Sequence, residues 1–510
     1  MSPSREFAVA SVLGDIVDRA KKNPGHLAAK DLDRELTYGE LIDEVVRIGE
    51  GLRKRGVREG DRIAILIPNS VDFVTTSLAC LWVGAVFVPL SVTDPPSRLE
   101  TVLSDCEPLM VIVSARDTAV VALLDGYSLV PVDQLRQESR ASTRVADNPT
   151  RVAYMIYTSG TTGKPKGVQI GSAAFATAVT STAQALGLSA ATRTLCVSPF
   201  HFDGSYANLF PTLISGGMVI MRPRDSLLFP RVFFNTVAQE GVTYSGFTPS
   251  YLRLLLASRQ MSDLNGSTLQ TLAFGGEPLP VADLRSLWSL VPSMRVFNRY
   301  GPTEATIAVT NVELTPEMVA GGTVTIGRPH PGVSFVLVDD VGGAVEEPDR
   351  VGELYIGGAQ LMAGYWADPV LTSGVMRDDV VPGETLYKTG DLVYRDQSDN
   401  YVYVGRADRV IKRSGVRISL LELSEAMGKL DAVTSSACLV FDREGELGIV
   451  AFVTTNAEIS EAELRHAARK LIPDNMVPDR IERVSAMPLN SSNQLDEKKL
   501  LSITGLRPLR

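Results

Sequence analysis

Cysteine and histidine are scarce in this chain of 510 residues, which holds four residues of each type. The cysteines form no CxxC pair and have no local histidine partners, which argues against a zinc site and against a disulfide framework. They are Cys80, Cys106, Cys196 and Cys438. A reducing compartment fits this pattern, and the predicted location is the cytoplasm.

Excess basic charge and long apolar runs are lacking as well. The net charge of -9 offers no positive field for a phosphate backbone, which argues against binding of DNA or RNA. The start of the chain, Met1 to Ala8, has no basic residues followed by an apolar core, so no signal peptide is expected. The most apolar segment, Phe73 to Leu90, contains hydroxyl residues and Gly84 and predicts a buried helix and strand, not a membrane span.

The hydrophobic pattern predicts an α/β fold. From Tyr38 to Val291, short Val/Ile/Leu runs alternate with helical periodicity, which is typical of parallel sheets covered by helices. Strands are expected at residues 62–68, 85–90, 109–114, 152–156, 194–198, 218–221, 242–245 and 269–274. Helices are expected at residues 38–55, 96–105, 173–188, 207–213, 230–240 and 281–291. Polar residues 134–150 are expected to form a surface connection.

After Val324 the pattern changes to short strands separated by glycine and proline, which indicates a small β subdomain. The final hundred or so residues alternate helix, strands and helix, as in a compact α+β lid. We therefore predict an N-terminal core of two doubly wound α/β subdomains plus the β subdomain at residues 1–407. A small mobile C-terminal domain is predicted at 408–510, with Asp408 as the hinge.

The segment from Tyr157 to Gly167 follows an expected strand and precedes an expected helix, so it is a loop. Its eleven residues include three glycines, four Ser or Thr hydroxyls and two lysines. Glycines let backbone N–H groups approach an anion, while hydroxyls add donors and lysines add charge, a combination suited to a polyphosphate. Pro165 stands where a Walker A loop needs Ser or Thr. A simple surface turn is the alternative interpretation.

This loop resembles the phosphate-binding signature of the adenylate-forming superfamily, which includes acyl-CoA synthetases, luciferases and the adenylation domains of nonribosomal peptide synthetases. Later segments resemble the other motifs of that superfamily, in the same order along the chain. The resemblance implies that ATP and Mg²⁺ are the cofactors. The phosphate-binding residues it implies are Thr158, Ser159, Gly160, Thr161, Thr162, Gly163, Lys164 and Lys166.

Residues 298–304 resemble the superfamily's adenine and magnesium motif. By this resemblance Tyr300 stacks on adenine, Thr303 contacts the α-phosphate, and Glu304 helps to hold Mg²⁺, a cation that prefers oxygen ligands. Asn298 and Gly301 belong to the same nucleotide-binding set. A proline-containing turn is the alternative interpretation of the segment taken alone.

Three further segments resemble nucleotide motifs. Residues 275–278 resemble the segment that lines the adenine pocket. These residues are Gly275, Gly276, Glu277 and Pro278. In the matching motifs, Asp391 accepts hydrogen bonds from both ribose hydroxyls and Arg406 contacts the nucleotide. Residues 412–418 resemble the segment that enters the active site when the lid rotates, with Lys412 as a candidate catalytic residue.

Residues 199–205 resemble the segment that selects amino acids. Asp203 matches the aspartate that pairs with a substrate ammonium, which acyl-CoA synthetases lack; a helix N-cap is the alternative role. Spacing adds a set of pocket positions: His201, Gly204, Ala207, Gly246, Ala273, Gly275, Arg299, Ile307 and Ala308. The small residues are expected to leave room for the substrate. Arg299 is expected to pair either with an anionic or strongly polar substrate side chain or with Asp203.

The last motif departs from the superfamily pattern. Asn493 and Gln494 stand where a glycine and the catalytic lysine belong. An amide keeps a donor but lacks the charge, and losing one preorganised donor of this kind costs about 2.7 to 4 kcal/mol in the transition state. Lys498 or Lys499 could take over the role.

The resemblance implies an amino-acid adenylating ligase, which forms an aminoacyl-AMP and transfers it to the phosphopantetheine thiol of a separate carrier protein. Such an activity belongs to nonribosomal peptide and antibiotic biosynthesis. No nucleic acid or membrane partner is expected. The alternatives are an acyl-CoA synthetase-like ligase and a catalytically impaired member that only binds a nucleotide or an amino acid.

Overall fold

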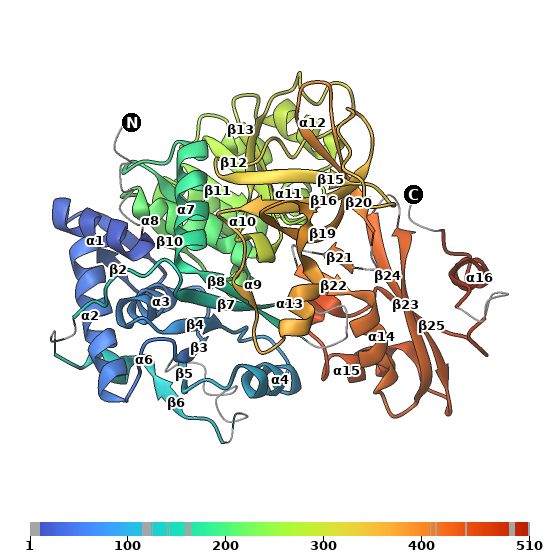
Figure 1. Ribbon diagram of the computed structural model, residues 1–510, viewed down its shortest axis with the longest axis horizontal. Helices are drawn as coiled ribbons and strands as arrows, with labels where there is room; N and C mark the ends of the chain where they lie inside the picture. The colour runs from blue at the N-terminus through green and yellow to red at the C-terminus, as the bar shows by residue number, and fades with distance from the viewer. Residues whose placement is uncertain are drawn as a thin grey trace. The chain divides into compact units, whose positions relative to one another are not determined.

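The computed structural model describes residues 11–507 apart from 115–123, 125, 140, 142, 159–164, 408–409, 414–415, 444–445 and 489–494 (Figure 1). Internal contacts divide the chain into two compact units. Unit 1 comprises Met1–Val92, Cys106–Ile156 and Gly167–Ala407, and unit 2 comprises Thr93–Asp105, Tyr157–Lys166 and Asp408–Arg510. The predicted rotation of a lid about Asp408 stays a prediction, because residue 408 lies outside the described residues.

Unit 1 contains an eight-stranded sheet in the order β14-β13-β12-β11-β9-β10-β1-β2. Its parallel strands are β1 (Leu27–Lys30), β9 (Arg193–Cys196), β10 (Met218–Met221), β11 (Tyr244–Phe247), β12 (Thr271–Gly275) and β13 (Arg295–Tyr300). The antiparallel edge strands are β2 (Glu35–Thr37) and β14 (Thr310–Leu314). The connecting helices include α8 (Tyr206–Ile214), α10 (Pro230–Glu240), α11 (Pro249–Leu256) and α12 (Val281–Leu290).

A seven-stranded sheet has the order β17-β8-β7-β4-β3-β5-β6. Its strands are β3 (Arg62–Leu66), β4 (Val86–Pro89), β5 (Met110–Val113), β6 (Leu129–Pro131), β7 (Val152–Thr158), β8 (Lys166–Gly171) and β17 (Gly364–Tyr365). Strands β3 to β7 pair in parallel, and the apolar runs of β3, β4 and β5 are buried on both faces, as is typical of a parallel sheet covered by helices. The accompanying helices are α1 (Val12–Lys22), α2 (Tyr38–Lys54), α3 (Val71–Val83), α6 (Val132–Arg136) and α7 (Ser172–Leu186), whereas nearly all of α4 (Pro96–Cys106) belongs to unit 2.

The two predicted doubly wound subdomains are present, but they exchange strands. The early strands β1 and β2 join the eight-stranded sheet, and the late strand β17 joins the seven-stranded sheet. Sequence order alone assigns these strands to the wrong neighbours, because pairing across a sheet is set by hydrogen bonding between distant segments. The segment expected to be an irregular connection begins with the short helix α6.

The predicted β subdomain is an antiparallel sheet of five strands. They are β15 (Val333–Val338), β16 (Gly352–Gly358), β18 (Met376–Val381), β19 (Glu384–Arg395) and β20 (Tyr401–Arg406). In unit 2 a hairpin of β21 (Val410–Arg413) and β22 (Val416–Ser419) precedes the three-stranded sheet. That sheet contains β23 (Val433–Arg443), β24 (Glu446–Thr455) and β25 (Arg480–Arg483). Its helices are α14 (Leu420–Gly428), α15 (Glu461–Ala468) and α16 (Glu497–Ile503). The α/β fold prediction is therefore confirmed.

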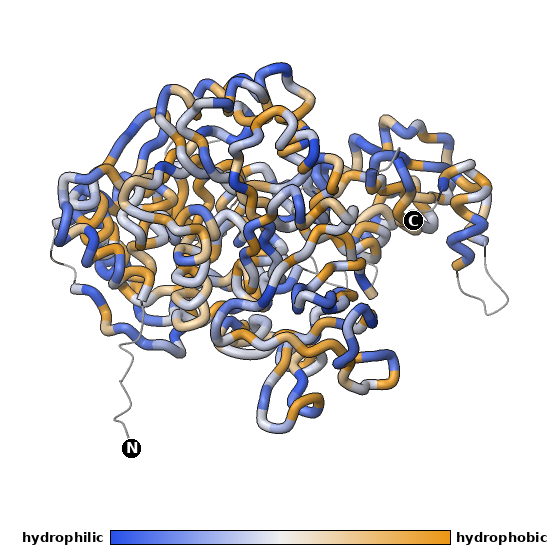
Figure 2. Tube along the Cα trace, turned by 90° about the horizontal axis from the view of Figure 1, so that it is seen from above, coloured by the Kyte–Doolittle hydropathy of each residue, from blue (hydrophilic) through white to orange (hydrophobic). Residues whose placement is uncertain are grey.

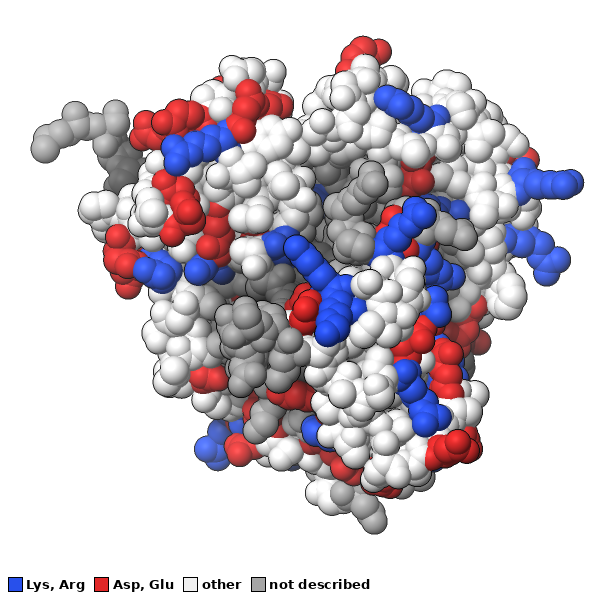
Figure 3. All heavy atoms as spheres, turned by 90° about the vertical axis from the view of Figure 1, so that its right-hand side faces the viewer, with Lys and Arg blue, Asp and Glu red and all other residues white. Residues whose placement is uncertain are grey.

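Hydrophobic and hydrophilic stretches alternate along the trace, as expected when each helix buries one face (Figure 2). The face shown in Figure 3 carries acidic and basic side chains together, which agrees with the absence of a net positive charge. Among the described residues, none of the helices has the length and apolar character needed to cross a bilayer.

Candidate nucleotide and substrate site

Strand β13 carries three of the predicted site residues in a row. Asn298 and Tyr300 lie on one face of the strand and Arg299 on the other, because side chains alternate along a strand. The Asn298 amide donates a 2.8 Å hydrogen bond to the carbonyl of Thr325, which anchors this end of the strand. Sequence analysis did not predict β13, since its arginines and asparagine break the apolar pattern.

Tyr300 belongs to a buried hydrogen-bonded group with Asp391 and Arg406, all within unit 1. Its hydroxyl donates to Oδ2 of Asp391 at 2.5 Å, and Nη1 of Arg406 donates to Oδ1 at 2.7 Å. Burial raises the pKa of Tyr300 well above its usual value and Asp391 raises it further, so Tyr300 stays protonated and can only donate to the carboxylate. Strands β19 and β20 set this geometry, since Asp391 and Arg406 are direct partners across them.

The three predicted nucleotide contacts, Tyr300, Asp391 and Arg406, therefore lie together. A carboxylate has about four lone-pair positions, and the two observed donors leave acceptor capacity for hydroxyl groups. Thr389 supports the group, because its hydroxyl accepts from the backbone N–H of Asp391 at 2.9 Å and donates to the carbonyl of Leu354 at 2.7 Å.

Glu304 lies in a 3-10 turn, Thr303–Ala305, directly after the Tyr300 strand. Glu304 is fully buried, and its Oε1 accepts a 2.8 Å hydrogen bond from the Tyr365 hydroxyl. The described residues contain no cluster of three or more acidic, histidine or cysteine ligands. A single carboxylate nevertheless fits Mg²⁺, which is usually held by one or two carboxylates together with the phosphates of a substrate.

The next residues adopt an unusual backbone conformation. Thr306 and Ile307 have φ angles of 58° and 67°, a region that is costly for β-branched residues. Gln360 holds them there. Its side-chain amide donates to the carbonyls of Ala308 at 2.8 Å and Thr306 at 3.2 Å, and its backbone carbonyl accepts from the Thr306 hydroxyl at 2.6 Å. Gly301 permits the close approach, because a Cβ there would lie 2.7 Å from Cα of Ala308. Two predicted pocket residues, Ile307 and Ala308, thus sit on a strained, clamped loop.

Gln360 is oriented in turn by His330, which sequence analysis missed. Since the Gln360 amide donates elsewhere, its Oε1 must accept from Nδ1–H of His330 at 3.0 Å, and Nε2 then accepts from the Asn311 amide at 2.8 Å. Burial lowers the pKa of His330, while the hydrogen bond to Gln360 opposes the shift. His330 is therefore neutral near pH 7.

We predict that acid destabilises the protein through His330. The folded pKa lies below the unfolded value of about 6.5, so the unfolded state binds the proton more tightly, and stability present above pH 6.5 is lost as the pH falls. The loss is about 1.4 kcal/mol for each unit of pKa depression. Thermal unfolding measured at pH 7.5 and at pH 5.5 should show that His330→Asn loses less stability on acidification than wild type does. The exposed His26→Asn is the control and should follow wild type.

The other face of β13 meets the predicted substrate positions. Arg299 pairs with Gly275 on β12, and Gly246 on β11 pairs with Ala273 on β12. Partners in register point to the same face of a sheet, and residues two apart on one strand do so as well. Arg299, Gly275, Ala273, Gly246 and Tyr244 therefore share one face of the eight-stranded sheet. The first four were predicted as pocket positions from the sequence. Tyr244 was not predicted and is added by the structure.

The guanidinium of Arg299 lies across this face. Its Nη1 approaches the Tyr244 hydroxyl at 3.2 Å, Oδ1 of Asn208 at 3.3 Å and the Ala207 carbonyl at 3.3 Å, and its Nη2 approaches the Ala273 carbonyl at 3.4 Å. Asp203 is not among its contacts, so the alternative pairing of Arg299 with Asp203 is not observed. A Cβ at Gly246 would overlap Arg299 and Asn208. The space expected for substrate at Gly246 is thus occupied by Arg299 itself.

Asp203 begins a short 3-10 turn, Asp203–Ser205, that leads into α8. It is 3% exposed. The N-cap of α8 is Ser205, and that cap has no side-chain hydrogen bond, so the alternative role of Asp203 as the helix cap is not observed. Burial raises the pKa of both Tyr154 and Tyr206, and the nearby Asp203 carboxylate raises each further.

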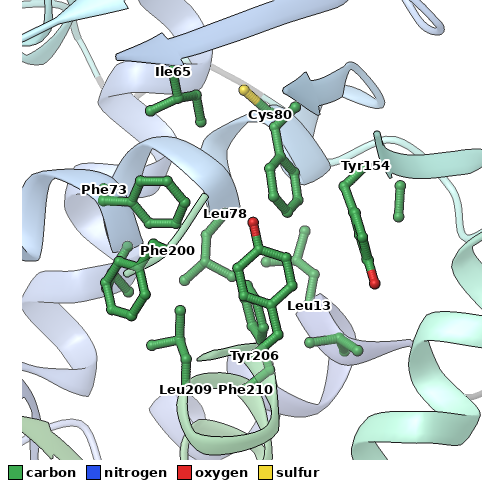
Figure 4. Packing of buried hydrophobic residues seen from close by; sticks show 14 of the residues in the cluster. Leu13, Ile65, Phe73, Leu78, Cys80, Tyr154, Phe200, Tyr206, Leu209 and Phe210 are labelled. Atoms are coloured by element: carbon green, nitrogen blue, oxygen red, sulfur yellow. The ribbon is translucent and has the colours of Figure 1, made fainter. Parts of the chain in front are cut away.

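The segment before Asp203 is held firmly. The backbone N–H of Phe200 donates to Oδ1 of Asn69 at 2.8 Å, and the Asn69 amide donates to the carbonyl of Ser198 at 2.8 Å. Phe200 packs against Phe73 with ring centroids 4.8 Å apart, next to Tyr206 and other core residues (Figure 4). The partly exposed His201 lies in this segment. Asn69 has no motif signal, because its partners are about 130 positions away.

Two remaining positions have structural contacts. Gly204 lies against the ring of Phe202, which leaves too little space for a Cβ. Glu277 accepts from the backbone N–H of Ser250 at 2.9 Å and from its hydroxyl at 2.7 Å, which fixes the start of α11. Beside Glu277, Gly276 has a φ angle of 85° and Pro278 is exposed.

The other predicted residues belong to unit 2 or lie outside the described residues. Thr158 ends β7 and Lys166 begins β8, and these two are neighbouring strands of one sheet. Lys412 pairs with Arg417 in the β21–β22 hairpin. The residues outside the described part are Ser159, Gly160, Thr161, Thr162, Gly163, Lys164, Asp408 and Gln494.

The chain belongs to the AMP-binding enzyme family of the ANL superfamily, whose model matches residues 16–366. Members of this family use ATP.

Relatives cover nearly the whole chain. Surfactin synthase subunit 2 of Bacillus subtilis (strain 168) is 30% identical over 94% of this chain, although the match spans 14% of that protein. The L-proline--[L-prolyl-carrier protein] ligase of Streptomyces coelicolor is 31% identical over 91% of each chain. The solved structure of PA1221, a nonribosomal peptide synthetase protein containing adenylation and PCP domains, is 25% identical. It superposes with a TM-score of 0.84 over 98% of each chain.

Proposed function

We propose that this ligase activates an amino acid as aminoacyl-AMP and transfers it to the phosphopantetheine thiol of a separate carrier protein. The observation that carries the proposal is the arrangement on β13, where Tyr300 faces Asp391 and Arg406 while the adjacent Arg299 faces the opposite side with Ala207. A nucleotide and a second substrate would then meet at neighbouring residues. The similarity to a carrier protein ligase of comparable length supports the same activity.

In the proposed reaction, one oxygen of the amino-acid carboxylate attacks the α-phosphorus of ATP and pyrophosphate leaves. Asp203 binds the ammonium group, and Asp391 accepts hydrogen bonds from the ribose. Both substrates are anions at the reacting atoms, so oriented donors and cations must offset their repulsion. Thr303 and the loop 158–166 are the proposed phosphate contacts, and Lys412 is proposed to act in the second half-reaction.

We propose Mg²⁺ as the metal, held by Glu304 and the phosphates of ATP. The buried carboxylate supplies the hard oxygen donor that this ion prefers. When bound, the ion would neutralise phosphate charge. The hydrogen bond from Tyr365 fixes the orientation of Glu304 for this role.

An ATP–pyrophosphate exchange assay over a panel of amino acids tests the proposal. Label should enter ATP only when the preferred amino acid is present, and loading of a phosphopantetheinylated carrier protein should then follow. Exchange driven by carboxylic acids without an amino group would favour an acyl-CoA synthetase-like ligase. ATP binding without exchange would favour an impaired binding protein.

A substitution at Gln494 separates the active from the impaired form. We predict that Gln494→Lys raises the adenylation rate at least about tenfold, a cautious fraction of the worth of one preorganised charged donor. Lys498→Ala and Lys499→Ala provide the comparison. If one of these lysines already acts as the catalytic cation, its replacement by alanine should remove activity. A fast wild type that none of the three substitutions changes would contradict any use of a lysine from this segment.

A further inference from the structure

Two arginines of unit 1 are equally buried but have different partners. Arg222 and Arg299 are each 7% exposed. Arg222 donates to Oε1 of Glu240 at 2.7 Å, a normal distance for a charged pair. Arg299 meets only neutral oxygens, at 3.2 to 3.4 Å. Among the described residues no carboxylate lies within ion-pair distance of Arg299.

The groups around Arg299 cannot supply a negative charge. Burial raises the pKa of Tyr244, and although Arg299 opposes the shift, the net direction is upward, so Tyr244 remains a neutral phenol. Burial also raises the pKa of the nearby Cys196 thiol to about 12. Asn208 is an amide whose Nδ2 donates to the carbonyl of Gly246 at 2.8 Å and whose Oδ1 accepts from Tyr244 at 2.8 Å. The guanidinium is therefore held in place by neutral groups alone.

A buried charge without a counterion is unfavourable, and a guanidinium presents a planar fork that matches a carboxylate. The position of Arg299 makes the substrate the natural source of that carboxylate. The Ala207 carbonyl that Arg299 contacts is on α8, directly after the Asp203 turn, and Gly275, its partner on β12, is partly exposed. The absence of a Cβ at Gly246 is what allows the guanidinium to reach this point.

We propose that Arg299 binds a second carboxylate of the substrate, so that the preferred substrate is a dicarboxylic amino acid. This inference rests on the proposed function. One carboxylate of the substrate attacks ATP, the other pairs with Arg299, and the ammonium pairs with Asp203. Three charged groups then fix the orientation of a small substrate, and a neutral side chain would leave the guanidinium without a partner.

The test compares acids with their amides in ATP–pyrophosphate exchange, using aspartate against asparagine and glutamate against glutamine, with alanine as a small neutral substrate. The acid and amide of each pair have nearly the same shape, so their ratio reports the charge. We expect kcat/KM for the best acid to exceed that for its amide by about a hundredfold or more, because sites built around a polar partner reject analogues that lack it.

Arg299→Gln should collapse this ratio, whereas Arg222→Gln removes an equally buried arginine elsewhere in the sheet and should leave the ratio unchanged. Arg299→Lys keeps the charge and should retain acid preference with a higher KM, which covers the case in which Arg299→Gln does not fold. A wild type that prefers neutral amino acids, or an unchanged ratio in Arg299→Gln, would overturn the inference alone. If none of the amino acids supports exchange, the proposed function is overturned as well.

Discussion

Asp203→Asn should lower kcat/KM for the amino acid by about thirty- to several-thousandfold, while the Kd of ATP changes by less than about threefold. Removing one partner of a buried charged pair costs about 2 to 5 kcal/mol, and each 1.4 kcal/mol is tenfold. Asparagine preserves the shape of the side chain, so the turn that leads into α8 should persist. Pyrophosphate exchange and nucleotide titration on the same preparation measure the two effects separately.

The exposed Asp225 of α9 (Arg224–Leu227) offers a control in the same unit. Asp225→Asn removes an equal charge from the surface, and both measurements should match wild type. Unchanged exchange in Asp203→Asn would remove the basis for assigning the ammonium to Asp203. A parallel fall in ATP affinity would indicate a general distortion of the site and not a lost substrate contact.

Asp391→Asn should weaken ATP binding and lower stability at the same time. Hydrogen bonds to a charged group contribute about 1.5 to 3 kcal/mol, so the KM of ATP should rise about ten- to a hundredfold. Arg406 would lose its carboxylate partner while remaining buried, and breaking a buried pair in this way destabilises by about 3 to 5 kcal/mol. Denaturant unfolding and ATP titration give the two quantities.

Asp379→Asn is the matched control, because Asp379 pairs with Arg377 at 2.5 Å but its side chain is 64% exposed. Exposed pairs contribute little, so stability and ATP binding should remain near wild type. If Asp379→Asn and Asp391→Asn change stability and the KM of ATP equally, the loss of one negative charge explains both effects, and the buried position of Asp391 does not. A loss of stability without a change in the KM of ATP would restrict Asp391 to a structural role.

The sequence predicted those parts of the fold that depend on local pattern. The helix expected at residues 230–240 matches α10, and the apolar runs around Arg62–Leu66 and Met110–Val113 are strands because both of their faces are buried. Strands β13 and β19 were missed, since polar site residues interrupt their hydrophobic pattern. The strand exchange between the two sheets was also beyond reach, because it depends on pairing between distant segments.

Site prediction followed the same division. Resemblance to the superfamily's motifs placed Tyr300, Asp391 and Arg406 in one nucleotide-binding set, and these three lie together. The supporting side chains Asn69 and Gln360 had no signal, because each acts on a partner far away in sequence. Local preference even opposes the backbone at residues 306 and 307, where β-branched side chains disfavour positive φ. Distant hydrogen bonds, not propensity, determine that loop.

A Cβ at position 246 would overlap both the guanidinium of Arg299 and the amide of Asn208, so Gly246 cannot be replaced alone. Any side chain at position 246 requires both Arg299 and Asn208 to give way, and shortening Arg299 alone leaves a void lined by Asn208 and Tyr244. Residues that share space in this way have strongly non-additive effects. Libraries that vary one position at a time would therefore miss side chains at position 246, and redesign of this enzyme for other substrates has to vary 246, 299 and 208 together.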